Sequence, residues 1–447
     1  MVAKASEVLD SSHIALPTIR DIPLDATSAI MYLVVFIAFL IATWRRPLVA
    51  LAGFILVEPF ALYRYIGSTT ITLPKVAIIA ILCGLVLRRT QWRAMFDRAT
   101  LPLLMGAVFV IIATALSYFQ ADYKIPVIRE SLKAVEFLAI YLLAIMCYRS
   151  EPNDLILQRT FFAIAATVSI LALTQEFTTA PAGILIGQHA VPRIAGPLEG
   201  PNQLSAYLGL LIPLLLAFVL RRGGNVFEWL CFAFAVVAEF LTFSRAGVAA
   251  SLVGVAAVFA FGGGRQAARY ALVFLALWIA GLASTFLVGG NPSHFFSAKS
   301  QFQPGGLGTR RELWTAAYRL WRLHPFLGIG AGNYQLELGR VGYPELRTHA
   351  NSGYIQALVE GGLPQFLAFI WIKWLSIAIF VRAHVREPLV LGTLGASIGL
   401  ALHQVLDCLT YYPKVGMLFW IMLGLGVANI TVLNANRDPQ VENAIVR

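Results

Sequence analysis

A histidine at the end of a long polar stretch is the residue best suited to chemistry in this chain. His349 lies in the segment Arg347-Thr348-His349-Ala350-Asn351-Ser352-Gly353-Tyr354, immediately before a new apolar run. An imidazole can take a proton from an attacking hydroxyl at neutral pH. Arg347 and the N-terminus of the helix expected there favour a negatively charged ligand. The alternative, a histidine that only makes hydrogen bonds, stays open.

Two arginines beside apolar runs are candidates for binding an anion. Arg193 lies among small and apolar residues, shortly before a helix start at Pro201-Asn202. Arg245 lies between two apolar runs that leave almost no loop, so it is held at or slightly below the membrane interface. A guanidinium group can bind two phosphate oxygens at once. The alternatives are a helix cap for Asn202 and contact with lipid headgroups for Arg245.

Further polar residues are candidates for the same ligand. Glu360 opens Glu-Gly-Gly-Leu-Pro, which interrupts an apolar run and predicts a kink that lines a cavity. His403 and Asp407 are four residues apart, which predicts one face of one helix, where they pair with each other or with an arginine, or are purely structural. Besides His349, Arg193 and Arg245, the candidate site residues are Asn202, Arg310, Arg311, Arg347, Asn351, Tyr354, Glu360, His403 and Asp407.

The elements that must hold these residues are membrane helices. The chain has 447 residues, of which 58% are hydrophobic and 13% charged, whereas a soluble domain has about 25% charged residues. A spanning helix needs roughly 20 apolar residues. We therefore expect an all-α, polytopic integral membrane protein with about 12–13 transmembrane helices and one large, partly helical loop. The apolar runs lie near 28–44, 48–62, 72–87, 101–119, 132–148, 160–176, 203–220, 225–243, 246–262, 270–288, 353–381, 388–408 and 414–433.

Polar segments divide the chain into five parts. We expect a polar N-terminal segment (1–27), a transmembrane helix bundle (28–288), a large loop carrying catalytic elements (289–352), C-terminal transmembrane helices (353–434) and a cytoplasmic tail (435–447). Within the large loop, Gly308 to Trp314 open a helix to about Leu323, with an apolar stripe at Leu313, Ala317 and Leu320.

Arginine-rich short loops predict the orientation. Loops that contain Arg45-Arg46, Arg88-Arg89 and Arg221-Arg222 alternate with segments poorer in basic residues, and the positive-inside rule puts the arginine-rich set in the cytoplasm. The large loop and the segments around 177–202, 244–246 and 409–413 then share the outer face, which is the periplasm in a double-membrane bacterium. The net charge of +11 mostly reflects anchoring arginines, so we expect a lipid bilayer and no nucleic acid as partner.

These pieces, in this order, resemble the O-antigen ligase and polymerase superfamily of bacterial membrane glycosyltransferases. The resemblance covers about 160–430, and Ala350 here separates a histidine and an asparagine that are often adjacent in the family. It is carried by Arg193 with Gly196 and Pro201-Asn202, Ser244-Arg245-Ala246-Gly247, Arg310 with Trp314, Pro325 with Gly328-Ile329-Gly330, and His349-Ala350-Asn351-Ser352-Gly353-Tyr354 with Leu358, Glu360 and Gly362.

The resemblance implies an enzyme of the bacterial inner (cytoplasmic) membrane with its active site facing the periplasm. It would transfer a preassembled glycan from a polyprenyl (undecaprenyl) diphosphate carrier to an acceptor hydroxyl, such as that of a lipid A-core sugar. No metal or other cofactor is implied. Arg193 and Arg245 would contact the diphosphate and His349 would assist the acceptor hydroxyl, so these three are the expected catalytic residues. Direct displacement by that hydroxyl predicts inversion at the anomeric carbon.

Other functions fit the same residues. Within the superfamily, the chain could be an O-antigen or exopolysaccharide repeat-unit polymerase, or a protein O-oligosaccharyltransferase. From another class, a solute transporter would also have buried ionisable residues and glycine-proline breaks in its helices. We find no internal inverted repeat, and the candidate charges gather at one membrane face, so the enzyme is favoured.

Overall fold

The computed structural model describes residues 25–60, 63–66, 69–89, 96–178, 182–186, 189–263, 267–288, 307–344, 346–383 and 387–437. Several sequence predictions fall outside these residues. They are most of the polar N-terminal segment, the first part of the large loop (289–306) and most of the C-terminal tail.

The described part of the chain is an all-α polytopic membrane protein, and the expected fold class is confirmed. Within it, nine helices are long and apolar enough to cross a membrane, and three shorter apolar helices accompany them. Each predicted apolar run coincides with a helix. The helices are α2 (Ala26–Arg45), α3 (Pro47–Val57), α4 (Leu73–Leu87), α5 (Leu101–Leu116), α6 (Lys124–Ser150), α7 (Asp154–Thr178), α8 (Pro201–Arg222), α9 (Val226–Leu241), α10 (Arg245–Gly262), α11 (Ala267–Leu287), α15 (Gly353–Ala383), α16 (Pro388–His403) and α17 (Pro413–Arg437).

Helices α8, α10 and α16 form a tightly packed group in the bundle. Small residues allow this, because a Cβ atom on Gly254 of α10 would lie 2.6 Å from the carbonyl oxygen of Gly395 on α16, and 3.0 Å from Pro213 of α8. Backbones come this close only where side chains are absent. The three helices therefore have fixed relative positions, and one end of each belongs to the candidate site.

Two short β-hairpins were not predicted. Strand β1 (Tyr63–Ile66) pairs with β2 (Thr69–Thr72), and β3 (Ala182–Ile186) pairs with β4 (His189–Arg193), both antiparallel. The residues of β3, Ala-Gly-Ile-Leu-Ile, do not alternate between polar and apolar, so the usual sequence signal of a half-buried strand is missing. The second hairpin matters for function, because Arg193 is its last residue.

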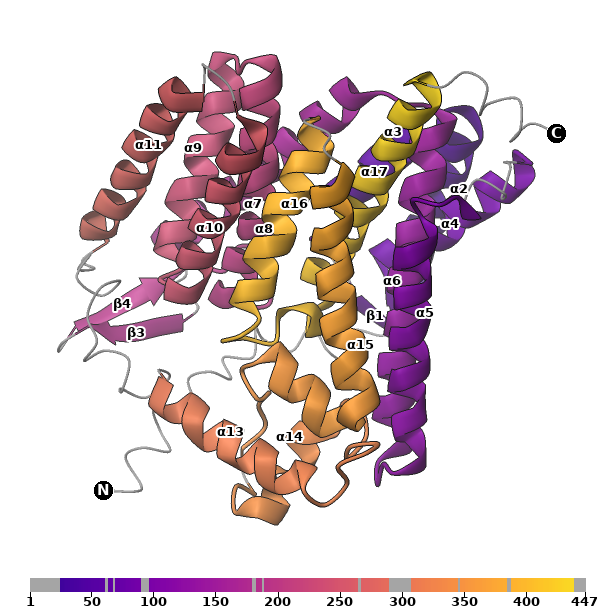
Figure 1. Cartoon of the computed structure of the whole chain (residues 1–447), viewed down its shortest axis with the longest axis vertical. Helices are drawn as coiled ribbons and strands as arrows, with labels where there is room; N and C mark the ends of the chain where they lie inside the picture. The colour runs from indigo at the N-terminus through magenta and orange to yellow at the C-terminus, as the bar shows by residue number, and fades with distance from the viewer. Residues whose placement is uncertain are drawn as a thin grey trace.

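The described part of the large loop (307–344 and 346–352) forms a folded layer over one end of the bundle (Figure 1). It contains α13 (Leu307–Trp321), α14 (Tyr334–Glu337) and the 3-10 helix η6 (Leu338–Val341). The predicted stripe of Leu313, Ala317 and Leu320 is buried. The small core of this layer consists of Ala316, Ala317, Leu320, Ile329, Tyr334, Leu338, Ala350 and Val359. The layer is therefore an ordered element with its own apolar centre.

A kink in α15 attaches this layer to the bundle. Gly362 has φ 61° and ψ −155°, which interrupts the helix two residues before Pro364, so the predicted kink is confirmed. The amide of Leu363 donates to the carbonyl of Phe326 at 3.1 Å, and the amide of Gly330 donates to the carbonyl of Glu360 at 2.8 Å. Backbone groups freed by the kink thus bind the loop.

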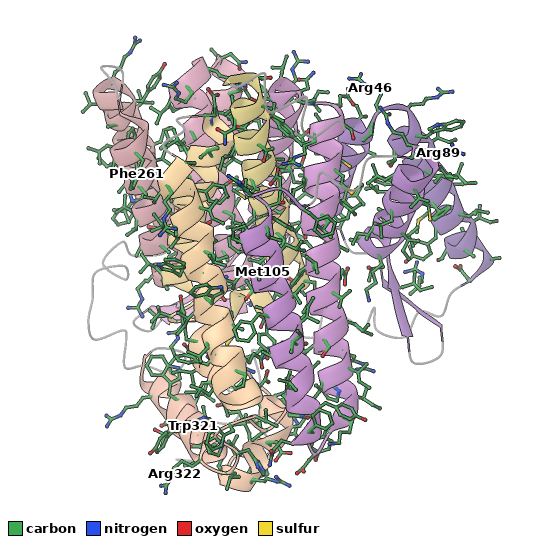
Figure 2. All side chains as sticks on the ribbon, turned by 45° about the vertical axis from the view of Figure 1, so that its right-hand side comes forward. Arg46, Arg89, Met105, Phe261, Trp321 and Arg322 are labelled. Atoms are coloured by element: carbon green, nitrogen blue, oxygen red, sulfur yellow. The ribbon has the colours of Figure 1, made fainter. Side chains whose placement is uncertain are left out.

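The two ends of the molecule carry different arginines. Figure 2 shows Arg46 and Arg89 at one end, and Trp321 and Arg322 of the loop layer at the opposite end. This separation fits the predicted orientation, in which Arg46 and Arg89 are cytoplasmic and the large loop lies on the other side.

Candidate functional site

Arg193 is held at the loop end of the bundle by bonds from two directions. Its Nε donates to the backbone carbonyl of Thr242 at 2.7 Å, and its Nη2 donates to Oδ1 of Asn202 at 2.8 Å. The amide nitrogen of Asn202 in turn donates to Oδ2 of Asp407 at 2.7 Å. A series of hydrogen bonds therefore connects the β3–β4 hairpin, the first turn of α8 and the segment that follows α16.

Arg245 and Arg310 join Arg193 in a cationic cluster. Arg310, on α13, donates from Nε to the carbonyl of Leu406 at 2.9 Å, next to Asp407. Burial lowers the pKa of Arg193 to about 10, and the charges of Arg310 and Arg245 add to this decrease. Arg193 still carries its proton at neutral pH. Arginines from three distant parts of the sequence thus meet at one place, as a common anion would require.

The pairing expected for His403 and Asp407 needs correction. They do not share a helix face, because α16 ends at His403 and Asp407 lies in the following loop. Burial raises the pKa of Asp407, while Arg310, Asn202 and Arg193 oppose the increase. His403 is buried against the start of α10, where its Cε1 would lie 2.9 Å from a Cβ on Gly247. Asp407 bonds to Asn202 and lies in the field of Arg310 and Arg193, which fits the alternative of an arginine partner.

Asn202 does not cap α8. The N-cap is Gly200, which has no side chain to make a capping bond. Asn202 lies inside the first turn, and both ends of its side-chain amide are used, one by Arg193 and the other by Asp407. Its place in the helix is fixed by α8, so it can orient Arg193.

His349 lies between two tyrosine rings. Its ring centroid is 5.1 Å from that of Tyr411 and 5.8 Å from that of Tyr412. Its Nδ1 is buried and has no hydrogen-bond partner among the residues that the structure describes. Burial and, to a lesser extent, the charge of Lys133 lower the pKa of His349 to about 4. The imidazole is therefore neutral at pH 7 and has a free nitrogen that can accept a proton.

The segment between α16 and α17 contacts both the arginine cluster and His349. Asp407 belongs to the cluster, and Tyr411 and Tyr412 pack on His349. The Tyr412 side chain is also hydrogen-bonded to Gln203, the neighbour of Asn202 on α8. The backbone amide of Gly353, at the start of α15, donates to the carbonyl of Asp407 at 2.9 Å. The two groups are therefore neighbours at one end of the molecule.

The remaining candidates bond within the protein. Arg347 donates to the carbonyls of Gln335 and Pro344, at 3.2 and 3.3 Å, and Arg311 is exposed on α13. Tyr354 donates from its hydroxyl to the carbonyl of Ala401 at 3.0 Å. Their roles as ligands of a substrate stay predictions.

Glu360 and Asn351 stabilise the junction of the loop and α15. Glu360 is buried and its Oε1 accepts from the amide of Tyr334 at 3.1 Å and from the side chain of Gln356 at 2.7 Å. Asn351 has a left-handed backbone, with φ 50°, a conformation that asparagine tolerates better than most residues. For both residues, substrate binding stays a prediction.

Sequence reasoning did not find the residues next to His349. They are Lys133 on α6, whose charge acts on His349, and Tyr411 and Tyr412 before α17, whose rings pack on it. A signal was present, because Glu130, Lys133 and Glu136 recur every three residues next to an apolar run. Charges at that spacing lie on one helix face and need a polar neighbour.

The fold and the site define a class: a polytopic helical membrane protein with a cationic cluster and a neutral imidazole under a folded loop layer. Residues 230–370 match a family model described as O-antigen ligase, so the chain carries a domain of that family and the resemblance seen in the sequence is confirmed. The matched region includes Arg245, Arg310 and His349 but neither Arg193 nor Lys133. No curated protein matches the chain. The match supports a membrane glycosyltransferase of the ligase or polymerase type.

Proposed function

We propose that this protein transfers a preassembled glycan from a polyprenyl diphosphate carrier to an acceptor hydroxyl at the membrane face covered by the loop layer. The observation that carries the proposal is the meeting of Arg193 and Arg310 at Asp407, with Arg245 close enough for its charge to act on both arginines. Three positive charges therefore gather beside the Asp407 carboxyl group. A diphosphate, with a negative charge on each phosphate, complements that excess of positive charge.

The arginines would stabilise the departing diphosphate. As the bond between the anomeric carbon and the diphosphate oxygen breaks, the electron pair stays on the diphosphate and its negative charge increases. Donors that are already fixed in position stabilise such charge best. Arg193 is fixed in this way, because Thr242 and Asn202 both accept from it. We propose the same role for Arg245, and a binding role for Arg310.

His349 would act as the general base. The acceptor oxygen forms a bond with the anomeric carbon, and its proton passes to the imidazole. A neutral imidazole with an unpartnered Nδ1 suits this step. Because the hydroxyl displaces the diphosphate directly, the configuration at the anomeric carbon inverts. We propose that the arginines compensate the diphosphate charge and that no metal ion is required.

The first test is glycan transfer by the purified protein in lipid nanodiscs. With a polyprenyl-diphosphate-linked glycan and an acceptor, His349→Ala is expected to lower the transfer rate by at least about a hundredfold, the usual contribution of a general base. His324→Ala is the matched control, since His324 is the other histidine described in the loop layer and its hydrogen-bond partner is Gln120. Equal rates in the wild type and His349→Ala would remove His349 from the reaction.

A glycan profile of a deletion strain identifies the type of acceptor. Polymer that accumulates on the lipid carrier without being attached indicates a ligase, with an acceptor such as a lipid A-core sugar. Single repeat units that accumulate indicate a polymerase. Loss of glycan from proteins alone indicates a protein glycosyltransferase. Counterflow of a solute by the purified protein, without any glycan transfer, would contradict the proposal and support a transporter.

A further inference from the structure

A lysine on α6 contacts the tyrosine that packs on His349. The ammonium group of Lys133 donates to the backbone carbonyl of Tyr411 at 2.9 Å and lies 4.8 Å from the centroid of the Tyr411 ring. Glu130, one turn earlier, accepts from the same ammonium group, with its Oε2 at 2.6 Å. Lys133 therefore holds the backbone and the ring of Tyr411 at once.

Tyr411 transmits this contact to His349. The Tyr411 ring lies 5.1 Å from the imidazole, centroid to centroid. Among the described residues, Lys133 is the one whose charge lowers the pKa of His349. The Lys133 side chain is 17% exposed, so water screens its charge less than at an open surface. A sheltered positive charge close to an imidazole disfavours the protonated ring.

We propose that Lys133 is a positioning residue for His349, which orients the imidazole through Tyr411. The role of His349 as base rests on the proposed function, whereas the coupling of the two side chains does not. Lys133 precedes the region that matches the family model, so the inference assigns a part of the site to the N-terminal half of the chain.

Two substitutions near His349 are expected to shift its pKa in opposite directions. Lys133 of α6 acts on His349 by charge and is itself paired with Glu130, and Tyr411 and Tyr412 pack on it from the segment before α17. Arg347, two residues earlier in the same segment, is bonded to backbone carbonyls. Lys133→Met removes a positive charge and is expected to raise the pKa of His349. Glu130→Gln removes the negative partner of Lys133 and is expected to lower it.

The experiment measures the protonation of His349 without relying on activity. Diethyl pyrocarbonate modifies neutral imidazoles, and mass spectrometry of the peptide that contains His349 gives the modified fraction across a pH series. In the wild-type protein we expect a midpoint near 4. Lys133→Met should raise the midpoint by about 0.5–1 pH unit, as expected for the loss of a nearby like charge. Glu130→Gln should lower it, and Lys133→Arg should restore the wild-type value.

Lys124→Met is the matched control. Lys124 is on the same helix, donates to the carbonyl of Tyr118 at 2.6 Å and lies 4.9 Å from that ring, so it repeats the contact away from His349. It should leave the midpoint unchanged. In transfer assays, Lys133→Met should lower kcat about tenfold with an unchanged KM for the donor, as a misplaced base would.

If Lys133→Met and Glu130→Gln shift the midpoint of His349 in the same direction, or if neither shifts it, the inference is overturned. A residue that only supports the fold would not give shifts of opposite direction in the two variants. If Lys133→Met does not insert into the membrane, Glu130→Gln still tests the sign of the shift, and Lys133→Arg tests whether a positive charge at this position is enough. Opposite shifts in a protein that transfers no glycan would support the coupling and refute the proposed function, so the two failures are distinguishable.

Discussion

At the scale of single residues, the site separates charge from proton transfer. Arg193, Arg245 and Arg310 supply positive charge, while His349 lies among aromatic rings and is neutral. Asp407 is joined to Arg193 through Asn202, and Tyr412, five residues further along the chain, packs on His349. Binding of a diphosphate and activation of a hydroxyl can therefore be tested independently.

Arg193→Lys tests the geometry of the cluster without changing its charge. An ammonium group on a different stem cannot satisfy both Thr242 and Asn202 as the guanidinium does. We expect kcat/KM for the donor to decrease by about 10- to 100-fold, equivalent to about 1.4–2.7 kcal/mol. Arg319→Lys, at an exposed position of α13, is the control. A variant as active as the wild type would mean that only the charge matters.

The pH dependence of transfer follows from the lowered pKa of His349. A protonated imidazole cannot accept another proton, so kcat/KM should decrease as the pH falls through about 4, and not through the ordinary histidine value near 6.5. Bound diphosphate adds negative charge nearby, which should raise the pKa of His349 in the complex and move the acid limb of kcat to higher pH. Rates measured across pH in the nanodisc assay check both limbs. Identical limbs near 6.5 would contradict a buried base.

At the scale of elements, the loop layer depends on the kink in α15. Gly362 has a positive φ, and a Cβ there would lie 2.2 Å from the carbonyl oxygen of Phe326. The same contact lets the amide of Leu363 bind that carbonyl. The kink thus determines where the loop layer, and with it Arg310 and His349, meets the bundle.

Gly362→Ala should weaken this attachment. The added methyl group meets backbone and also strains a left-handed residue, which costs about 1 kcal/mol or more. We expect a lower melting temperature and faster proteolysis of the loop layer. Gly342→Ala is the control, because Gly342 also has a positive φ but no atom within 4 Å of its Cβ position. Equal effects of the two variants would show that strain alone, and not the contact with Phe326, is important.

The sequence predicted the helices well and the contacts of the site only in part. A membrane helix must be a long apolar run, so each run could be identified by itself. The kink predicted for the segment that begins at Glu360 was also correct, because glycine and proline affect the backbone locally. Hairpin β3–β4, the bridge through Asn202 and the partners of His349 depend on segments far apart in the sequence. No local pattern links Lys133 to Tyr411. The spacing of His403 and Asp407 suggested that both lie on one helix, but α16 ends at His403.

At the scale of the whole molecule, the two ends are chemically distinct. Arg46 and Arg89 lie at one end, and the loop layer with Trp321 and Arg322 lies at the other (Figure 2). The proposed function needs the loop layer on the outer side of the membrane, where the glycan carrier presents its sugar.

Cysteine labelling in intact cells tests this orientation. In a Cys83→Ala background, a membrane-impermeant thiol reagent should label Arg322→Cys and leave Arg89→Cys unlabelled until the cells are opened. The other native cysteines, Cys147, Cys231 and Cys408, are buried, so their background should be low. Labelling of Arg89→Cys alone would invert the topology and place the arginine cluster in the cytoplasm.

The contact between Gly254 and Gly395 has a consequence for ligand affinity. Since the backbones of α10 and α16 touch there, neither helix can slide relative to the other without separating first. If the diphosphate binds at Arg245 as proposed, these helices would lose little entropy on binding it, and more of the interaction energy would remain as affinity. Larger side chains at either glycine should weaken donor binding from a distance, even with every arginine in place.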